Sequence, residues 1–174
     1  MKFSFAPYRE RRYLVSRLIA FLIVAGGIFI DVLTKRLAVT HLKGQPSFVL
    51  IPGVFQFTYE ENPGAAFGSF SDRPWVFMLV SSVAILLIAF YILYKTDIKP
   101  VFLYALAAVL SGGIGNMIER VSQGYVVDFF DFCLIDFAIF NVADCFVTVG
   151  AFCMILVLVF EIFAEAKKKN ADKD

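Results

Sequence analysis

The chain has 174 residues, of which 60% are hydrophobic and 18% charged, and its mean hydropathy is +0.78. A soluble globular domain is about half apolar and a quarter charged, so this composition excludes a disordered, a disulfide-rich secreted or a nucleic-acid-binding protein and predicts a membrane protein. The 16 basic residues nearly balance the 15 acidic ones, so the positions of the charges carry more information than their sum. The length favours one domain, residues 1–174.

Four apolar segments approach the roughly 20 residues that a helix needs to cross the hydrocarbon layer. These predicted spans are residues 18–37, 75–94, 101–118 and 142–164. The second contains no charge and is bounded by Trp75 and Tyr94, residues typical of the membrane interface. A cleaved signal peptide is the competing interpretation of residues 1–40. Asp31 and Lys35 stand where a small-residue cleavage site is expected, so we predict that the first span is retained.

Basic residues near the ends of the spans predict the orientation in the membrane. With four crossings, three basic groups lie on one side: Lys2, Arg9, Arg11, Arg12 and Arg17; Lys95 and Lys99; and Lys167, Lys168, Lys169 and Lys173. The opposite side has only Lys35, Arg36, Lys43, Arg73 and Arg120. The sequence therefore predicts an all-α membrane protein, a four-transmembrane-helix bundle with both termini in the cytoplasm and a charged cytoplasmic tail over 165–174.

The two outer loops contain strand-like patterns. Residues 47–61 alternate partly between apolar and polar and are interrupted by Pro52 and Gly53, which predicts a β-hairpin. The outer loop 119–141 is aromatic, β-branched and acidic, and can add a strand or an interfacial segment to that hairpin. We therefore expect a small β-structure on the extracytoplasmic side.

Ionisable groups at the membrane are functional candidates because they are costly to place there. Asp31 and Lys35 are four residues apart and share one helix face. They either contribute to a functional site or form an intrahelical ion pair whose charges reach the interface. The sequence leaves both alternatives open.

Asp128 and Asp144 are candidates for a pair of carboxylates. Asp128 lies among apolar residues, which predicts a raised pKa, and Asp144 follows it closely at the start of the fourth span. Two carboxylates held together share a proton and can catalyse acid–base hydrolysis of a peptide bond. Asp144 can also simply complement the helix dipole. Other acidic combinations stay open; they involve Glu119, Asp131 and Asp136.

Other catalytic and binding sites find little support in the sequence. His41 is the only histidine, so a zinc site with two histidines is impossible. Gly112, Gly113 and Gly115 lie within the third span, where we expect close helix packing rather than nucleotide binding. We expect no metal and no cofactor.

Four stretches together resemble the prolipoprotein signal peptidases, also called signal peptidase II, a family of bacterial membrane aspartic proteases. They agree with the motifs of that family in order, spacing and placement relative to the spans, and the match covers most of the chain. The stretches are DVLTK (31–35), ENPGAAFG (61–68), GGIGNMIERVSQGYVVDFF (112–130) and FNVADC (140–145).

The resemblance implies that Asp128 and Asp144 are the catalytic pair, the same two residues that the apolar context favoured. It also implies that Asp31 and Lys35 support the architecture and that six residues line or brace the site and contact substrate: Asn62, Gly64, Asn116, Arg120, Asn141 and Ala143. The sequence departs from the family pattern at Val32, where glutamine is usual, and at Glu119, where aspartate is usual.

The function that the resemblance implies is removal of the signal peptide from diacylglyceryl-modified prolipoproteins, with cleavage just before the lipid-bearing cysteine. The expected partners are lipid-modified substrates and membrane lipids, without nucleic acid, and the expected form is a monomer. The expected location is the bacterial cytoplasmic (inner) membrane, with the active site on its outer side. Two alternatives remain: a small transporter with a path through Asp31, Asp128 and Asp144, and a non-catalytic assembly protein that binds a partner through the hairpin.

Overall fold

The computed structural model describes residues 6–64, 74–135 and 137–171, with the backbone alone at residues 6–10, 74, 77 and 171. Residues 65–68 of the second motif, together with Arg73 and Asp136, lie outside the described residues. In chain order the elements are α1 (Ala6–Leu42), β1 (Phe48–Ile51), β2 (Phe55–Asn62), α2 (Pro74–Tyr94), α3 (Pro100–Gln123), β3 (Val126–Asp131), the short 3₁₀ helix η2 (Cys133–Ile135) and α4 (Val142–Ala171).

Three of the described helices are long and apolar enough to cross a membrane. They comprise Arg11–Leu42, Pro100–Gln123 and Val142–Asn170, and Met78–Tyr94 forms a shorter apolar helix within α2. Most leucine, phenylalanine and valine side chains on α1, α4 and the described part of α2 are exposed, as expected for surfaces that contact lipid. The structure is therefore a mostly helical membrane protein, as the composition predicted.

The helices extend beyond the apolar segments that predicted them. α1 has 37 residues and α3 continues to Gln123, into the region expected to be an outer loop. The segment predicted as a charged tail is helical as far as Ala171. The apolar run marks where lipid lies, whereas helical hydrogen bonding continues through polar residues such as lysine and glutamate that have high helix propensity.

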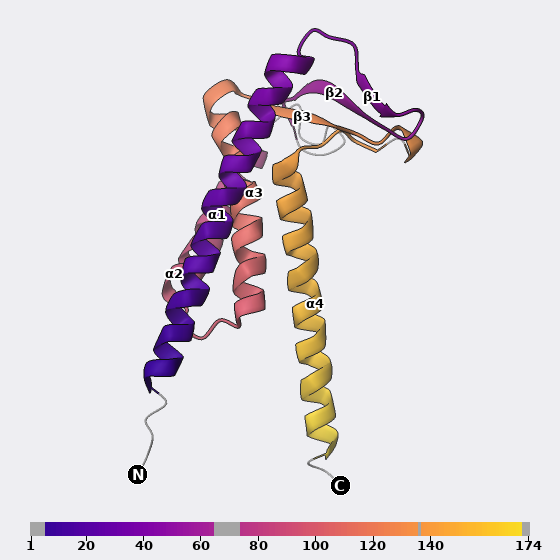
Figure 1. The fold of residues 1–174 in the computed structure, drawn as a ribbon. Helices are drawn as coiled ribbons and strands as arrows, with labels where there is room; N and C mark the ends of the chain where they lie inside the picture. The colour runs from indigo at the N-terminus through magenta and orange to yellow at the C-terminus, as the bar shows by residue number, and fades with distance from the viewer. Residues whose placement is uncertain (1–5, 65–73, 136, 172–174) are drawn as a thin grey trace.

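The three strands form one antiparallel sheet in the order β1-β2-β3. β1 and β2 make the predicted hairpin, with Phe48 opposite Phe57 and Gly53 at the turn with φ of +72°. β3, from the second predicted loop, pairs with β2 so that Glu60 faces Asp128. The sheet lies at the end of the molecule where α1 ends and α4 begins (Figure 1).

α3 is the central helix and packs against α1, α2 and α4. Its glycines permit this close packing: a Cβ atom on Gly112 would lie 2.2 Å from the Ala143 carbonyl oxygen of α4, and one on Gly115 would lie 2.6 Å from Asp31 Oδ2 of α1. The predicted packing role of these glycines is confirmed.

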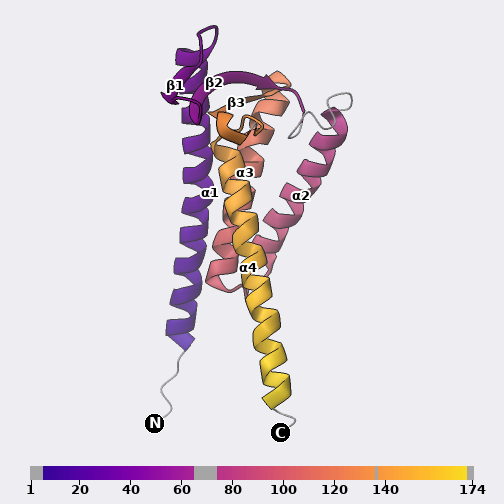
Figure 2. The ribbon, with the colours of Figure 1, turned by 90° about the vertical axis from the view of Figure 1, so that its right-hand side faces the viewer.

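α1 begins and α4 ends at the same end of the molecule, opposite the sheet (Figure 1). The connection between α2 and α3, which contains Lys95 and Lys99, lies toward that end as well. α2 leans away from the other helices as it approaches the end with the sheet (Figure 2). The residues of the three basic groups that the structure describes thus lie at one end of the bundle.

Candidate functional site

The candidate site lies where β3 meets the first turn of α4. After β3 the chain returns so that Phe140 pairs with Phe130: the Phe130 N–H donates to the Phe140 carbonyl at 2.8 Å, and the Phe140 N–H donates to the Phe130 carbonyl at 3.1 Å. This bridge ends one residue before Asn141. It therefore places the start of α4 beside Asp128 on the neighbouring strand.

Asn141 is the N-cap of α4 and Asp144 is the third residue of its first turn. The Asp144 N–H donates to Asn141 Oδ1 at 3.0 Å, and the Asn141 N–H donates to Asp144 Oδ2 at 3.1 Å. This reciprocal pair is a capping box. A negative charge on Asp144 complements the positive end of the helix dipole. The interpretation of Asp144 as a helix-terminus carboxylate is therefore compatible with its position in the candidate site.

Asp128 is 2% exposed, and both of its carboxylate oxygens accept hydrogen bonds. Asn141 Nδ2 donates to Oδ1 at 2.5 Å, and Asn62 Nδ2 donates to Oδ2 at 2.8 Å. Burial raises the pKa of Asp128 to about 7; the Asn62 bond opposes this rise and the neighbouring charge of Asp144 adds to it. At neutral pH this carboxyl group is therefore poised between its protonated and ionised forms.

Asn116 of α3 connects the two aspartates. Its Nδ2 donates to Asp144 Oδ1 at 2.8 Å, while its Oδ1 accepts from Asn141 Nδ2 at 3.1 Å. Because Asn141 Nδ2 also donates to Asp128, two asparagine amides join the two carboxyl groups. The structure thus brings together the predicted carboxylate pair.

Asp31 and Lys35 lie behind this pair. Lys35 Nζ is 2.9 Å from Asp31 Oδ2 and 3.0 Å from Glu119 Oε2, and it donates to Asn116 Oδ1 at 2.8 Å. The side chains of Asp31 and Lys35 are only 1% and 3% exposed, so the interpretation in which their charges reach the interface is wrong. Three oxygen-bearing side chains of the site surround this ammonium group and make its burial tenable: Asp31, Glu119 and Asn116.

Asp31 also reaches the first turn of α4. Its Oδ1 accepts the N–H of Ala143 at 2.9 Å, across 112 positions of the sequence. Ala143 is fully buried, which leaves this helix end without water to satisfy its N–H groups. The carboxylate of α1 therefore replaces water at the helix terminus that holds Asp144.

Arg120 and Gly64 complete the predicted set on the side of β2. Arg120 Nη2 donates to the Gly64 carbonyl at 3.0 Å, and the Gly64 N–H donates to Asn62 Oδ1 at 3.0 Å. Asn62 thereby uses its amide oxygen to hold the chain after β2 and its amide nitrogen to hold Asp128. All ten predicted site residues lie in one connected arrangement.

The other acidic candidates divide between this arrangement and the sheet. Glu119 belongs to the arrangement, where its Oε2 also accepts the Val127 N–H at 3.1 Å. Asp131 instead accepts from Gln56 Nε2 at 2.7 Å and Thr58 Oγ1 at 2.8 Å across the sheet. No group of three or more metal-ligating side chains occurs among the residues that the structure describes.

The sequence interpretation missed one cluster beside Asn62. Lys43 Nζ and Tyr59 Oη each lie 2.8 Å from Glu61 Oε1. The hydrogen bond from Lys43 is the main cause of a lowered pKa at Glu61, and burial is the main cause of the rise in the pKa of Tyr59 to about 12. No signal in the sequence pointed to this cluster, because its lysine lies outside every motif.

Comparison with known proteins assigns the family. A family model described as signal peptidase (SPase) II matches residues 19–160. The chain belongs to the signal peptidase II family. Relatives include the lipoprotein signal peptidase of Caldanaerobacter subterraneus subsp. tengcongensis, 41% identical over 142 residues that cover 82% of this chain and 97% of the relative. That of Brevibacillus brevis is 39% identical over 150 residues, covering 86% and 98%.

Solved structures agree with this assignment. A bacterial membrane enzyme determined by the in meso method at 2.3 Å resolution is 29% identical with a TM-score of 0.76, covering 83% of this chain and 89% of its own. A second, at 1.9 Å resolution, is 30% identical with a TM-score of 0.72, covering 80% and 92%. The resemblance found in the sequence motifs is confirmed: this signal peptidase II family member is a protease with several membrane-spanning helices and bacterial relatives.

Proposed function

We propose that this signal peptidase II family member is an aspartic endopeptidase that cleaves diacylglyceryl-modified prolipoproteins just before the lipid-bearing cysteine. One observation carries the proposal: Asn116 and Asn141 join the carboxyl groups of Asp128 and Asp144, one on a buried strand and the other at a helix N-terminus. A carboxyl pair in two such different environments supplies an acid and a base at the same pH.

Asp144 is the base in this mechanism and Asp128 the acid. Asp144, ionised, takes a proton from water as the water oxygen bonds to the scissile carbonyl carbon. Protonated Asp128, whose pKa is raised to about 7 by burial, gives its proton to the carbonyl oxygen. The protons then move back: Asp144 protonates the leaving nitrogen of the cysteine, the C–N bond breaks, and Asp128 recovers its proton. The pair titrates as a unit.

The supporting residues hold this pair and the substrate. Asn62 and Arg120 border the site from β2 and α3, so their amide and guanidinium groups are suited to bind the substrate backbone and the lipid headgroup. Lys35 and Asp31 act from behind through Asn116 and the first turn of α4. No metal or cofactor is needed for this chemistry.

We also propose four membrane crossings, with both termini in the cytoplasm of a bacterial cell and the site at the outer face of the inner membrane. The 21 residues of α2 extend about 31 Å at 1.5 Å per residue, which matches the hydrocarbon thickness. The basic groups at the end opposite the sheet favour the cytoplasmic side for that end. The protein acts as a monomer in this proposal, because one chain supplies every residue of the site.

The test is cleavage of a diacylglyceryl-modified prolipoprotein by purified protein in liposomes. Asp128→Asn and Asp144→Asn should each lose roughly 10²- to 10⁴-fold in rate, the usual contribution of a general acid or base. Asp131→Asn is the matched control, since it makes the same change on the same strand outside the network, and it should cleave normally. An unlipidated substrate should not be cleaved. Full cleavage by either site variant would refute the aspartic mechanism.

Family membership favours this peptidase over the two alternatives from the sequence. The transporter hypothesis required Asp31 to lie on an ion path, whereas Asp31 is occupied by Lys35 and by the Ala143 N–H. Proton flux through the wild-type protein in liposomes without proteolysis would support the transporter hypothesis instead. Unchanged biological function in both Asp128→Asn and Asp144→Asn would support the hypothesis of a non-catalytic assembly protein.

A further inference from the structure

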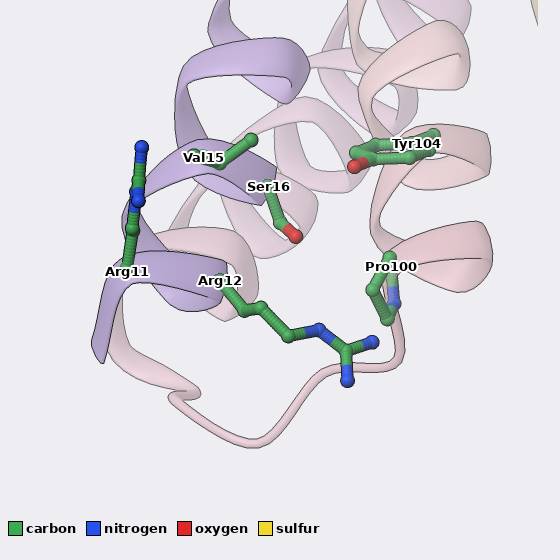
Figure 3. A pocket seen from close by; sticks show the side chains of 6 residues that line it. All are labelled: Arg11, Arg12, Val15, Ser16, Pro100 and Tyr104. Atoms are coloured by element: carbon green, nitrogen blue, oxygen red, sulfur yellow. The ribbon is translucent and has the colours of Figure 1, made fainter. Parts of the chain in front are cut away.

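A cavity lies far from the candidate site, at the end of the molecule where α1 begins and α4 ends. Its volume is about 430 Å³, and it opens between the N-terminal parts of α1 and α3 (Figure 3). The residues that line it are Arg11, Arg12, Val15, Ser16, Pro100 and Tyr104. None of them takes part in the network around the two aspartates, so the proposed peptidase mechanism leaves this cavity without a role.

The lining is amphiphilic. Arg12 and Ser16 are four residues apart on α1, and Pro100 and Tyr104 are four residues apart on α3, so two helix faces form the walls. Figure 3 shows the Arg12 side chain extending toward Pro100 and the Tyr104 hydroxyl facing α1. The cavity thus combines guanidinium and hydroxyl groups with apolar walls of valine, proline and an aromatic ring.

The surroundings are strongly basic. Residues 11–18 and 95–104 contain five basic residues and a single acidic one, Asp97. Lys99 is paired with Glu161 at 2.8 Å, and an Arg17 guanidinium nitrogen donates to the Lys95 carbonyl. α3 begins beside the cavity with no acidic residue in its first turn, so its dipole adds positive potential. The charge at this place favours an anion.

The neighbouring helix surfaces identify the kind of anion. Leu14, Leu18 and Val101, next to the cavity along α1 and α3, are 65%, 58% and 62% exposed. In a bilayer these surfaces contact acyl chains, so a molecule held by the arginines can extend its apolar part along them. A soluble anion gains nothing from these surfaces, whereas a phospholipid uses both the charge and the apolar walls.

We propose that this cavity binds the headgroup of an anionic phospholipid, with its phosphate held by Arg12 and with Arg11 adding positive charge at the rim. Basic pockets between transmembrane helices are suited to such headgroups. In the proposed orientation the lipid belongs to the cytoplasmic leaflet, opposite the leaflet in which cleavage takes place. The binding is independent of the peptidase mechanism, so either proposal can fail without the other.

The test is native mass spectrometry of the full-length protein, released from neutral detergent and titrated with phosphatidylglycerol or phosphatidylcholine. We expect phosphatidylglycerol to bind more tightly than phosphatidylcholine. The double variant Arg11→Gln/Arg12→Gln should bind phosphatidylglycerol about 30-fold more weakly, from roughly 1 kcal/mol for each basic residue. The variant Tyr104→Phe should weaken binding less, because it removes only a hydroxyl group.

The matched control is Lys168→Gln/Lys169→Gln, which removes the same charge at the same end of the molecule, on α4 and outside the cavity. It should keep the affinity of the parent protein. An equal loss of phosphatidylglycerol affinity in both double variants would show diffuse attraction to the surface. Equal binding of phosphatidylcholine would show no selection for charge, and either result overturns the proposal.

A further measurement is competition by inorganic phosphate: displacement of the lipid at millimolar concentration would assign the cavity to a soluble anion and overturn the proposal. Prolipoprotein cleavage by Arg11→Gln/Arg12→Gln in neutral detergent should be unchanged, which also establishes that the variant is folded.

Discussion

Lys35 Nζ donates a hydrogen bond of 2.8 Å to Asn116 Oδ1, across 81 positions of the sequence. An ammonium group can only donate, so it fixes the Asn116 amide with its oxygen toward Lys35 and its nitrogen toward Asp144. The same oxygen accepts from Asn141, which fixes that amide with its nitrogen toward Asp128. Lys35 therefore orients, through Asn116 and Asn141, hydrogen-bond donors that both aspartates receive.

Replacement of Lys35 by methionine should impair both folding and cleavage. The change leaves Asp31 buried without its cation, and loss of one partner of a buried pair costs about 3–5 kcal/mol in the free energy of unfolding. With the amides free to turn, we expect kcat to fall more than KM rises. Thermal unfolding and steady-state cleavage measure the two effects. The control is Arg36→Met, the exposed neighbouring cation; an equal loss in this control would contradict the positioning role of Lys35.

At Glu119, where the family usually has aspartate, a shorter side chain should destabilise the protein less than loss of the negative charge. Its Oε2 contacts both Lys35 Nζ and the Val127 N–H, at 3.0 and 3.1 Å. Glu119→Asp is one methylene shorter and should lose one of these contacts, which lowers the free energy of unfolding by about 1 kcal/mol. Glu119→Gln leaves Lys35 with fewer negative partners and should destabilise more. The reverse ranking in thermal unfolding, with Glu60→Gln as the exposed control, would contradict this account.

The raised pKa of Asp128 predicts how both cleavage and stability depend on pH. Cleavage should decline as pH rises through about 7, because the proposed acid loses its proton. Between pH 3.8 and about 7 the folded protein holds a proton that the unfolded chain has released, so this group lowers stability as pH rises through that window. Asp128→Asn removes the titration. The melting temperature of this variant relative to wild type should therefore increase from pH 5 to pH 8, and a constant difference would exclude a raised pKa.

Gly112 and Gly26 both lie within helices but differ in the space around them, so substitutions at the two positions test the helix packing. A Cβ atom at Gly112 would lie 2.2 Å from the Ala143 carbonyl oxygen, whereas one at Gly26 would have nothing within 4 Å. Gly112→Ala should force α3 and α4 apart, destabilise the protein by about 1–3 kcal/mol and reduce cleavage, because Ala143 adjoins Asp144. Gly26→Ala should be neutral or stabilising by up to about 1 kcal/mol. Thermal unfolding in detergent compares the two, and equal effects would contradict this packing argument.

Sequence alone determined the parts of this protein that depend on local composition. The apolar runs predicted the helices, because each residue in a bilayer must satisfy its backbone within its own segment. The alternation around Pro52 and Gly53 predicted the hairpin, and the apolar neighbours of Asp128 predicted its raised pKa. Resemblance of the motifs then supplied Asn62, Asn116, Arg120 and Asn141, which no local pattern distinguishes from other polar residues.

The tertiary structure alone decided how these residues act on one another. Asp31 satisfies the Ala143 N–H across 112 positions, and Asn62 holds Asp128 across 66. It also decided that the Asp31–Lys35 pair is buried, and that arginines of α1 share a cavity with the start of α3. Hydropathy and spacing report the preference of each residue for lipid or water. The direction of a hydrogen bond depends on which distant group fills the space opposite, and that is settled only when the helices pack.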